Sequence, residues 1–433
     1  MSKFSLFRYL DPAIIDDESS TARASKTPAV WPSEASAVRV DKSLFPIFGA
    51  CLRKQAYRMI GWPRKQETAA ESPWKWIVGR AVEEKLTELA KYQSEKAGIE
   101  HIYVAHGVRL FIQDFYLPVE MDVIVRDPET GRGWIVECKT YDGYYAEKAI
   151  EKEEKPKEEN LIQACIYLLE AESGAKLKKL IKKSIDERRK LDELNEAKLA
   201  RGEKIFEHRN RSEASMEMVD KLDDGPLGCK LVYIARGTLH RTEFDIEIFE
   251  DFDGFHYPMV DGFPYKIFSI ESIYERFRTG QNYWFRMRQE AVDLLAAKGI
   301  VPPETVRLIL NRGDVAAPQT EDRQLSSKEW AIEKEYFERL EAEVRGLPES
   351  FFPPPEYEWS YSPGRIEELF AAKQLSKNMY TKFKKGEVTR LGDWQCGWCP
   401  YAATGCIQKQ RPDLAYQVYD FANLPESAEV TIG

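Results

Sequence analysis

The sequence predicts an α/β fold in which a central mixed β-sheet is flanked by helices, and three observations lead to this prediction. Three strand-like runs follow one another between residues 101 and 140, and two more lie between residues 230 and 248. Segments with apolar residues at helical spacing stand before, between and after these runs. One cysteine near the start and three near the end indicate that the two ends of the chain meet at a shared inorganic centre.

Length and composition limit the kind of protein this can be. A chain of 433 residues allows two or three domains, or one domain with large insertions, and the cysteine positions favour the second. With 43% hydrophobic residues a sizeable core can form, and the sequence shows neither an apolar run of about 18 residues nor a secretory signal, so we expect a cytoplasmic, intracellular protein without a membrane partner. The formal net charge of -9 argues against a general nucleic-acid coating protein, so any phosphate binding must come from local basic patches.

The N-terminal part of the chain is expected to hold an arm, two helices and the first strands. Residues 1 to about 40 show no sustained period, which predicts a loosely held arm. Apolar residues recur at helical spacing from Leu44 to Trp62 around Cys51, and Trp74 to Ala97 is predicted to be a long amphipathic helix. The predicted strands are His101 to Phe111, Phe115 to Val125 and Gly133 to Thr140, with a hairpin turn at Asp127-Pro128-Glu129-Thr130-Gly131.

The rest of the chain alternates predicted helices with a second pair of strands. A helix is expected from about Glu158 to Glu170, followed by a charged, solvated helical insertion at about 173–228. Strand signals return at Lys230 to Arg236 and Leu239 to Ile248. Beyond Pro264 the pattern is mostly helical up to the C-terminal cysteines, with breaks at Pro302-Pro303 and Pro353-Pro354-Pro355.

Two carboxylates and one amine are predicted to converge on two neighbouring strands. Because side chains alternate along a strand, Glu137 and Lys139 should point the same way, and Asp122 on the preceding strand can reach the same place. Carboxylates in such a group can hold Mg²⁺ or Mn²⁺, which polarises a phosphate and acidifies a water molecule. The amine can orient that water or stabilise charge that builds up on the phosphate.

A structural interpretation of the same three residues is a cross-strand ion-pair ladder on a solvated sheet face. Isolated motif matches of this kind are usually accidental. The surrounding strand residues are too apolar for a solvated rim, and buried carboxylates need a compensating partner such as a metal ion. The apolar neighbours are Met121, Val123, Val125, Trp134, Ile135 and Val136.

These motifs also stand in a characteristic order. They run Gly79-x3-Glu83, Asp122, Glu137-x-Lys139 and Gln163-x3-Tyr167, bracketed by the four cysteines. This order resembles the PD-(D/E)XK nuclease superfamily, and within it the iron-sulfur branch that includes the RecB-like nucleases of CRISPR adaptation, the AddB nuclease domain and related viral and mitochondrial exonucleases. The stretch at 43–57 is similar to the first-cysteine region of that branch. The resemblance covers about 43–170, 230–250 and 390–410, and it implies a restriction-endonuclease-like core.

Roles follow from the resemblance residue by residue. It implies that Asp122 and Glu137 bind the metal ion, Mg²⁺ or Mn²⁺, and that Lys139 is the catalytic lysine. Gln163 and Tyr167, at positions i and i+4 of one helix, would position the scissile strand or the lysine; alternatively they form an ordinary helix-packing pair. The third metal ligand would be Glu83, which stands where many relatives carry a histidine. Its neighbour Glu84 is the alternative ligand.

The cysteines Cys51, Cys396, Cys399 and Cys406 are assigned by the resemblance to a structural [4Fe-4S] cluster. Four thiolates can equally make a structural Zn²⁺ site, and the C-x2-C spacing does not decide between them. The remaining cysteines lie in apolar stretches and are predicted to be small core residues. These are Cys138, Cys165 and Cys229.

Two local basic patches are the candidates for DNA binding. One follows Cys51, and the other interleaves lysines with aromatic residues shortly before the C-terminal cysteines, a pattern suited to a single strand. Solvated helix faces would explain both patches as well. The residues singled out are Arg53, Lys54 and Arg58 in the first patch, and Lys382, Lys384 and Lys385 in the second.

The resemblance implies a metal-dependent deoxyribonuclease, an exonuclease acting on single-stranded or unwound DNA ends. Two alternatives stay open: an endonuclease that trims DNA for recombination or CRISPR adaptation, with a partner protein, or a DNA-end-binding protein that does not cleave. The related viral exonucleases leave open that the chain is virus-encoded. The expected organisation is an arm at 1–40, a nuclease core at 41–261, a helical region at 262–390, and a C-terminal cluster-binding segment at 391–433 packed with the Cys51 region.

Overall fold

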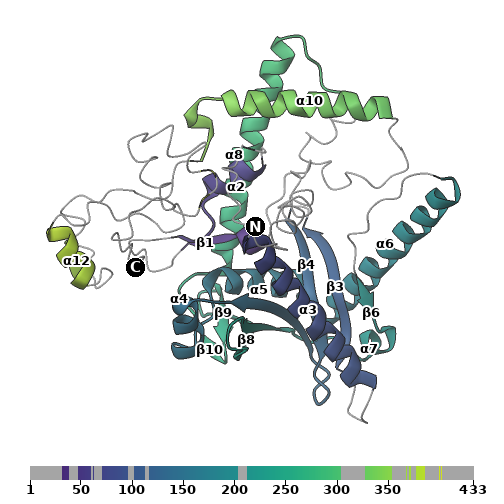
Figure 1. Ribbon diagram of the computed structural model, residues 1–433, viewed down its shortest axis with the longest axis vertical. Helices are drawn as coiled ribbons and strands as arrows, with labels where there is room; N and C mark the ends of the chain where they lie inside the picture. Colours follow the sequence, from purple (N-terminus) through teal and green to yellow (C-terminus); the bar gives the residue numbers. More distant parts are fainter. Residues whose placement is uncertain are drawn as a thin grey trace, which may run out of the picture.

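The computed structural model shows an α/β protein (Figure 1). It describes residues 32–38, 47–59, 62, 71–95, 102–112, 117–202, 212–303, 327–353, 367, 370–371, 377–385, 399 and 401. Its strands are β1 (Ser36–Val38), β2 (Ile47–Gly49), β3 (Tyr103–Ile112), β4 (Leu117–Arg126), β5 (Gly133–Tyr141), β6 (Glu213–Ala214), β7 (Gly228–Ala235), β8 (Arg241–Glu250), β9 (His256–Val260) and β10 (Phe263–Pro264). Its helices are α2 (Leu52–Met59), α3 (Glu71–Glu95), α4 (Tyr144–Glu147), α5 (Glu158–Ala171), α6 (Gly174–Ala200), α7 (Met216–Lys221), α8 (Ile270–Ala297), α10 (Ser327–Gly346) and α12 (Lys377–Lys384), with short helical turns η1 (Pro32–Glu34), η3 (Lys148–Lys152) and η4 (Glu349–Phe351).

The predicted central mixed sheet is confirmed. It has eight strands in the order β10-β9-β8-β7-β5-β4-β3-β6. The pair β5 and β7 is parallel, with Lys139 opposite Tyr233, and every other pair in this sheet is antiparallel. The five strands predicted from sequence correspond to β3, β4, β5, β7 and β8. The predicted turn closes the β4–β5 hairpin through a hydrogen bond from the Gly131 N–H to the Asp127 carbonyl of 2.9 Å.

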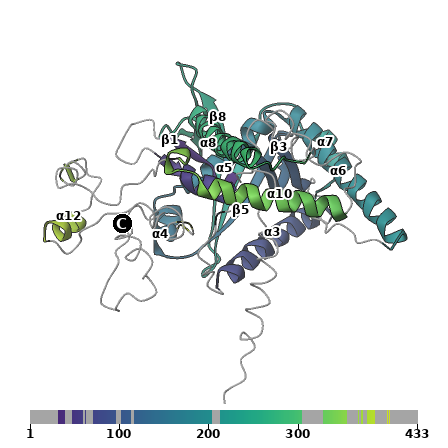
Figure 2. The ribbon, with the colours of Figure 1, turned by 90° about the horizontal axis from the view of Figure 1, so that it is seen from above.

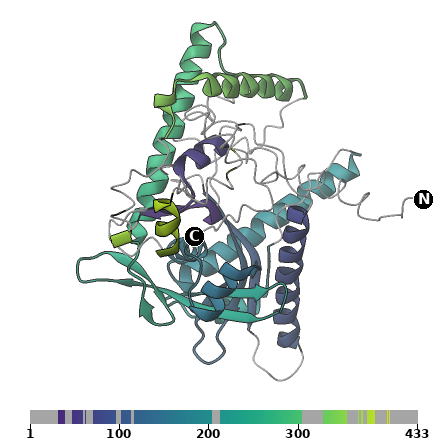
Figure 3. The same cartoon turned by 60° about the vertical axis from the view of Figure 1, so that its left-hand side comes forward.

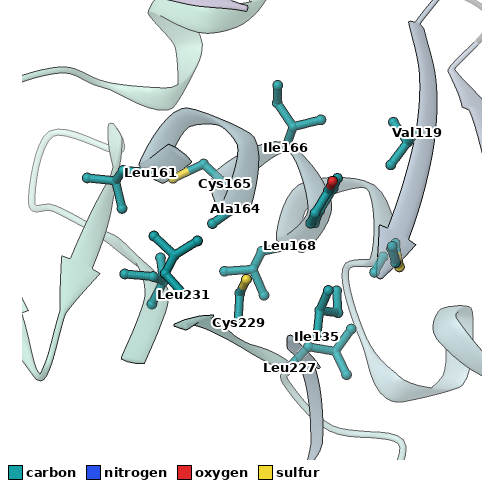
Figure 4. Packing of buried hydrophobic residues seen from close by; sticks show 14 of the residues in the cluster. Val119, Ile135, Leu161, Ala164, Cys165, Ile166, Leu168, Leu227, Cys229 and Leu231 are labelled. Atoms are coloured by element: carbon teal, nitrogen blue, oxygen red, sulfur yellow. The ribbon is translucent and has the colours of Figure 1, made fainter. Parts of the chain in front are cut away.

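Helices cover both faces of the sheet near its centre. Helix α5 lies against the face that carries Glu137, because its Gln163 hydrogen-bonds that carboxylate. Helix α3 approaches the opposite face, where Gly79 comes close to Thr140, and Figure 2 shows the two helices on either side of the strands. Between α5 and the sheet lies the main hydrophobic core (Figure 4). Its members include Ile135, Leu161, Cys165, Ile166, Cys229 and Leu231.

A second hydrophobic core lies away from the sheet, around the C-terminal half of α8. Helix α8 leads from the sheet to α10, which crosses its far end (Figures 1 and 3). Tyr57 of α2, Trp284 of α8 and Leu340 of α10 are all buried there. Tyr401 joins this core, with its ring centroid 5.7 Å from that of Tyr57. Residues from both ends of the chain therefore build one packed unit.

Three expectations differ from the structure. The arm expected up to residue 40 contains strand β1, which pairs with β2 at 47–49, inside the segment expected to be helical. Helix α6 in the insertion expected to be solvated buries Leu177 and Ile181 in the main core, one turn apart, beside β3. The strands β6, β9 and β10 extend the sheet beyond the prediction.

None of the helices that the structure describes is long and apolar enough to cross a lipid bilayer.

Candidate active site

Asp122 lies where the β4–β5 ladder ends. Cα pairing between these strands runs from Arg126 to Val123, which pairs with Val136. One residue further on, the Asp122 carboxylate accepts a hydrogen bond of 3.1 Å from the Cys138 backbone N–H. The Asp122 side chain, rather than a backbone carbonyl of β4, thus accepts the hydrogen bond from this N–H of β5. This hydrogen bond fixes the Asp122 carboxylate next to the segment that carries Glu137 and Lys139.

Glu137 is a buried carboxylate with one satisfied and one unsatisfied oxygen. The residue is 1% exposed. Its Oε1 accepts from the Lys139 ammonium, as expected for two side chains on one face of a strand, and from Gln163 Nε2 at 2.8 Å. Its Oε2 is buried and has no hydrogen-bond partner. A carboxylate oxygen in this state is costly unless a cation or a donor reaches it.

Gln163 and Tyr167 tie helix α5 to both strands. Gln163 Nε2 also donates to the Tyr167 hydroxyl at 2.5 Å, and that hydroxyl donates to the Glu120 carbonyl of β4 at 3.0 Å. Both side chains are buried, and Gln163 Oε1 has no hydrogen-bond partner. The pair therefore does more than pack the helix on the sheet, since its hydrogen bonds hold the Glu137 carboxylate in position from the α5 side.

Glu83 on α3 is the closer of the two glutamates that sequence left open. Its side chain is half-buried, whereas Glu84 is exposed. The charge of Glu83 also raises the pKa of Asp122 and of the Cys138 thiol, so Glu83 lies within electrostatic range of the site.

The site crowds negative charge around one ammonium. Burial, then the charges of Glu137 and Glu83, raise the pKa of Asp122 well above its ordinary value, against the opposing effect of Lys139. Burial lowers the pKa of Lys139, but the charges of Glu137 and Asp122 outweigh this and leave its pKa above the ordinary value. Lys139 is therefore a protonated hydrogen-bond donor near neutral pH. Its single positive charge only partly compensates the negative charges of Asp122, Glu137 and Glu83.

Tyr233 is a site neighbour that the sequence did not point to. It pairs with Lys139 across the parallel β5–β7 ladder. Its buried hydroxyl accepts from Asn160 Nδ2 at 2.8 Å and from the Lys157 backbone N–H at 3.1 Å, and burial raises its pKa to about 12. Only the register between two strands that lie far apart in sequence brings it here, and no local pattern encodes that register.

A solvated ion-pair ladder does exist on this sheet, but elsewhere. Lys230 of β7 is ion-paired with Glu243 and Asp245 of β8, both at 2.6 Å, and the two carboxylates are about half exposed. Glu137, in contrast, has a side chain that is 2% exposed. The group around Glu137 therefore does not fit the solvated-ladder interpretation.

The donor set around Glu137 fits a divalent ion only in part. Within the described ranges, no group of three or more His, Cys, Asp or Glu side chains is arranged to hold a metal ion, so the predicted set of Glu83, Asp122 and Glu137 is not assembled as three direct ligands. Two oxygen acceptors at the site, Glu137 Oε2 and Gln163 Oε1, are buried without partners. Mg²⁺ is often held by one or two carboxylates, with substrate phosphate and water completing its shell. Asp122 and Glu137 fit that arrangement, with Glu83 further out.

The two basic patches differ in what they offer to DNA. Arg53 is 1% exposed, ion-paired with Glu349 and placed over the Tyr57 ring, so its guanidinium does not face solvent in this structure and its predicted DNA contact stays a prediction. A guanidinium with an apolar stem packs well in an aromatic core, which sequence alone did not reveal. Lys54 is half-buried, and Arg58 is ion-paired with Glu34.

In the second patch, all three lysines lie at or just beyond α12. Lys384 and Lys385 are exposed, and Lys384 is ion-paired with Glu367 and lies over the Tyr380 ring at 5.5 Å. Lys382 is a residue of the helix. Because exposed lysines lie beside an aromatic ring here, the second patch is a better candidate for DNA binding than the first.

Two of the four predicted cluster cysteines are described. Cys51 directly precedes α2, and Cys399 packs against the second core to which Tyr57 of α2 belongs. Cys396 and Cys406 lie outside the described residues, so the predicted four-cysteine centre stays a prediction. Cys165 and Cys229 are fully buried, as predicted for core residues, whereas Cys138 is half-buried.

Asp122→Asn should stabilise the metal-free protein and weaken metal binding. The pKa of the Asp122 carboxyl is higher in the folded than in the unfolded protein. Such a group contributes fully to the free energy of unfolding at pH values below its pKa in the unfolded chain, and this contribution is lost as pH rises through its pKa in the folded protein. An ionised Asp122 therefore lowers the stability of the metal-free fold near neutral pH, and asparagine, which carries no charge, removes this effect. We expect a higher melting temperature in EDTA at about pH 8, together with loss of the increase that Mn²⁺ gives the parent. Asp245→Asn, in the exposed ladder, should keep the Mn²⁺ response; an unchanged Mn²⁺ response in Asp122→Asn would remove Asp122 from the ligand set.

No protein-family model, curated protein or solved structure matches this chain in comparisons of sequence and fold.

Proposed function

We propose that the protein is a metal-dependent deoxyribonuclease that hydrolyses phosphodiester bonds, acting as an exonuclease on single-stranded or unwound DNA ends. The observation that carries the proposal is the state of Glu137. Its carboxylate is buried, held on one oxygen by Lys139 and Gln163, and unpartnered on the other. A fold has no stabilising reason to keep such an oxygen near a second carboxylate, that of the half-buried Asp122, whereas a cation site does.

The side chains divide the chemistry between them. A divalent ion held by Asp122 and Glu137 would polarise the scissile phosphate and acidify a water molecule. Lys139, kept protonated by its neighbours, donates hydrogen bonds and stabilises negative charge that develops on the phosphate. It is not suited to act as a general base, because its pKa is raised. Gln163 orients the Glu137 carboxylate of β5 through its hydrogen bond, and Tyr167 anchors the same helix to the Glu120 carbonyl of β4.

A structural [4Fe-4S] cluster on Cys51, Cys396, Cys399 and Cys406 is the second part of the proposal. It is supported by the second core, where Cys399 and Tyr401 pack with Tyr57, six residues after Cys51. A cluster needs four thiolates at one place, and this core brings the segments of two of them together. Zn²⁺ remains the alternative occupant. Both assignments suit a protein of the cytoplasm, where thiols stay reduced.

The test uses end-labelled linear and circular single-stranded DNA with the anaerobically purified full chain. We expect Mn²⁺ or Mg²⁺ to support degradation of the linear strand and EDTA to stop it, while the circle persists. Cleavage of the circle would identify an endonuclease instead. Tight binding of linear DNA without cleavage in either metal would identify a DNA-end-binding protein and overturn the proposed activity.

A further inference from the structure

The turn between β7 and β8 stands at the same end of the sheet as the catalytic group. Because β5 and β7 are parallel, their C-terminal ends coincide: Tyr141 pairs with Ala235, and the Arg236 N–H donates to the Tyr141 carbonyl at 2.9 Å. Lys139 precedes Tyr141 by two residues and pairs with Tyr233. At a rise of about 3.3 Å per residue, Gly237 lies within about 13 Å of Tyr233 along the chain. The hairpin tip therefore borders the site.

This tip is exposed and basic. Residues 237–241 are all exposed, and 236–241 contain two arginines and a histidine with no acidic residue. Arg236 is ion-paired with Asp142, whereas Arg241 makes no ion pair with any residue that the structure describes. Glu243, the nearest acid along β8, is already paired with Lys230. The tip thus offers an uncompensated guanidinium to solvent.

The opposite end of strand β8 has the reverse charge. Its turn at 251–255 carries Asp251 and Asp253 beside the fully exposed Phe252. An exposed apolar side chain therefore stands at each end of the strand. Phe252 lies in an acidic turn whose Asp251 is ion-paired with Lys266, whereas Leu239 lies in a turn that itself carries two arginines and a histidine. This asymmetry matches an anionic polymer that passes one end of the sheet.

Leu239 at the tip combines exposure with an unfavourable backbone. It is 70% exposed and has φ of 59°, in the left-handed region where glycine is at ease and leucine is strained. Its N–H donates to the Ala235 carbonyl at 2.9 Å, which fixes this conformation. A strained, exposed leucine contributes little to the fold, and strain of this kind gathers where a chain contacts a ligand.

We infer that the β7–β8 hairpin tip binds the DNA strand beside the scissile bond. Arg241 contacts a phosphate, and Leu239 packs against a base or sugar next to it. Single-stranded DNA offers both groups together, since its bases are not stacked inside a duplex. The inference rests on the proposed nuclease function and names a residue pair that selects its substrate.

The experiment measures binding of a fluorescent single-stranded oligonucleotide in the Lys139→Ala background, so that the DNA stays intact. We expect Leu239→Gly to weaken binding about fivefold through lost apolar contact. Arg241→Gln should weaken binding and lower the salt slope by about 0.7, the value for one phosphate contact on a single strand. Leu239→Gly should keep or raise the melting temperature, because glycine relieves the strain, so weaker binding could not be ascribed to unfolding.

The control is Glu172→Gly, which places glycine at another exposed residue with a positive φ, 53°, at the far end of α5. It should leave DNA binding unweakened. Parent-level binding and salt slope in both tip variants would overturn the hairpin inference and leave the nuclease proposal standing. Absence of DNA binding and cleavage by the parent chain would overturn both.

Discussion

Lys139→Ala is expected to abolish metal-dependent DNA cleavage while leaving DNA binding in place. The ammonium is the only cation in direct contact with Glu137 among the described residues, and the proposed mechanism assigns it to the negative charge that develops on the phosphate. Removing one pre-organised charge-stabilising donor typically lowers turnover by about 10²–10³-fold. The loss should appear in the catalytic rate rather than in affinity, because the DNA contacts proposed at the hairpin tip remain.

Lys230→Ala is the matched control for this variant. Lys230 also lies on a central strand of the same sheet and also pairs with two carboxylates, but on the solvated ladder of β7 and β8. Single-turnover cleavage rates, with melting temperatures measured beside them, should show a large loss for Lys139→Ala and near-parent rates for Lys230→Ala. Equal rates in the parent and the Lys139→Ala variant would remove the lysine from the mechanism.

The central sheet could be predicted because its long strands carry their own signals. Strands β4 and β5 are alternating or continuous apolar runs joined by a turn whose Asp127, Pro128 and Gly131 favour that geometry. The short strands could not be predicted, because a run such as 47–49 becomes a strand only by pairing with 36–38. The same limit applies to α6, whose Leu177 and Ile181 are few among many charges and bury themselves only because β3 lies beside them.

Of the candidate site, sequence could predict the residues that share one element or one hairpin. Glu137 and Lys139 alternate along β5, Asp122 lies across a tight turn, and Gln163 and Tyr167 are one helical turn apart. Residues whose place in the site depends on strand register or packing between distant segments could not be predicted from the sequence. Tyr233 reaches the site through the β5–β7 register, and Arg53 is withdrawn from solvent by an aromatic core built from three distant segments.

Cys399→Ser is expected to remove the cluster and destabilise the second core before the sheet. Joining Cys51 to Cys399 closes a loop of about 350 residues, for which the length-dependent entropy cost is about 5 kcal/mol. Without a ligand at Cys399, the packing of Tyr401 on Tyr57 would have to hold the C-terminal segment, while Tyr57 would still pack on Phe352 and Arg53 would still pair with Glu349. Anaerobically purified parent should be brown, with broad absorption near about 400 nm, whereas the variant should lose both colour and iron.

The packing of the two cores sets the order of unfolding that this variant should show. Trp284 and Leu340 belong to the second core, whereas Ile273 and Phe277, from the N-terminal half of α8, belong to the main core around α5. Thermal unfolding of Cys399→Ser should therefore show an early loss of helicity in α10 and the C-terminal half of α8, and a later loss of the sheet. Cys165→Ala, in the main core, should keep the colour and lose stability through a small cavity instead. Brown colour retained in Cys399→Ser would exclude this thiolate as a cluster ligand, and a colourless parent that contains zinc would assign the centre to Zn²⁺, because a d¹⁰ ion has no visible absorption of its own.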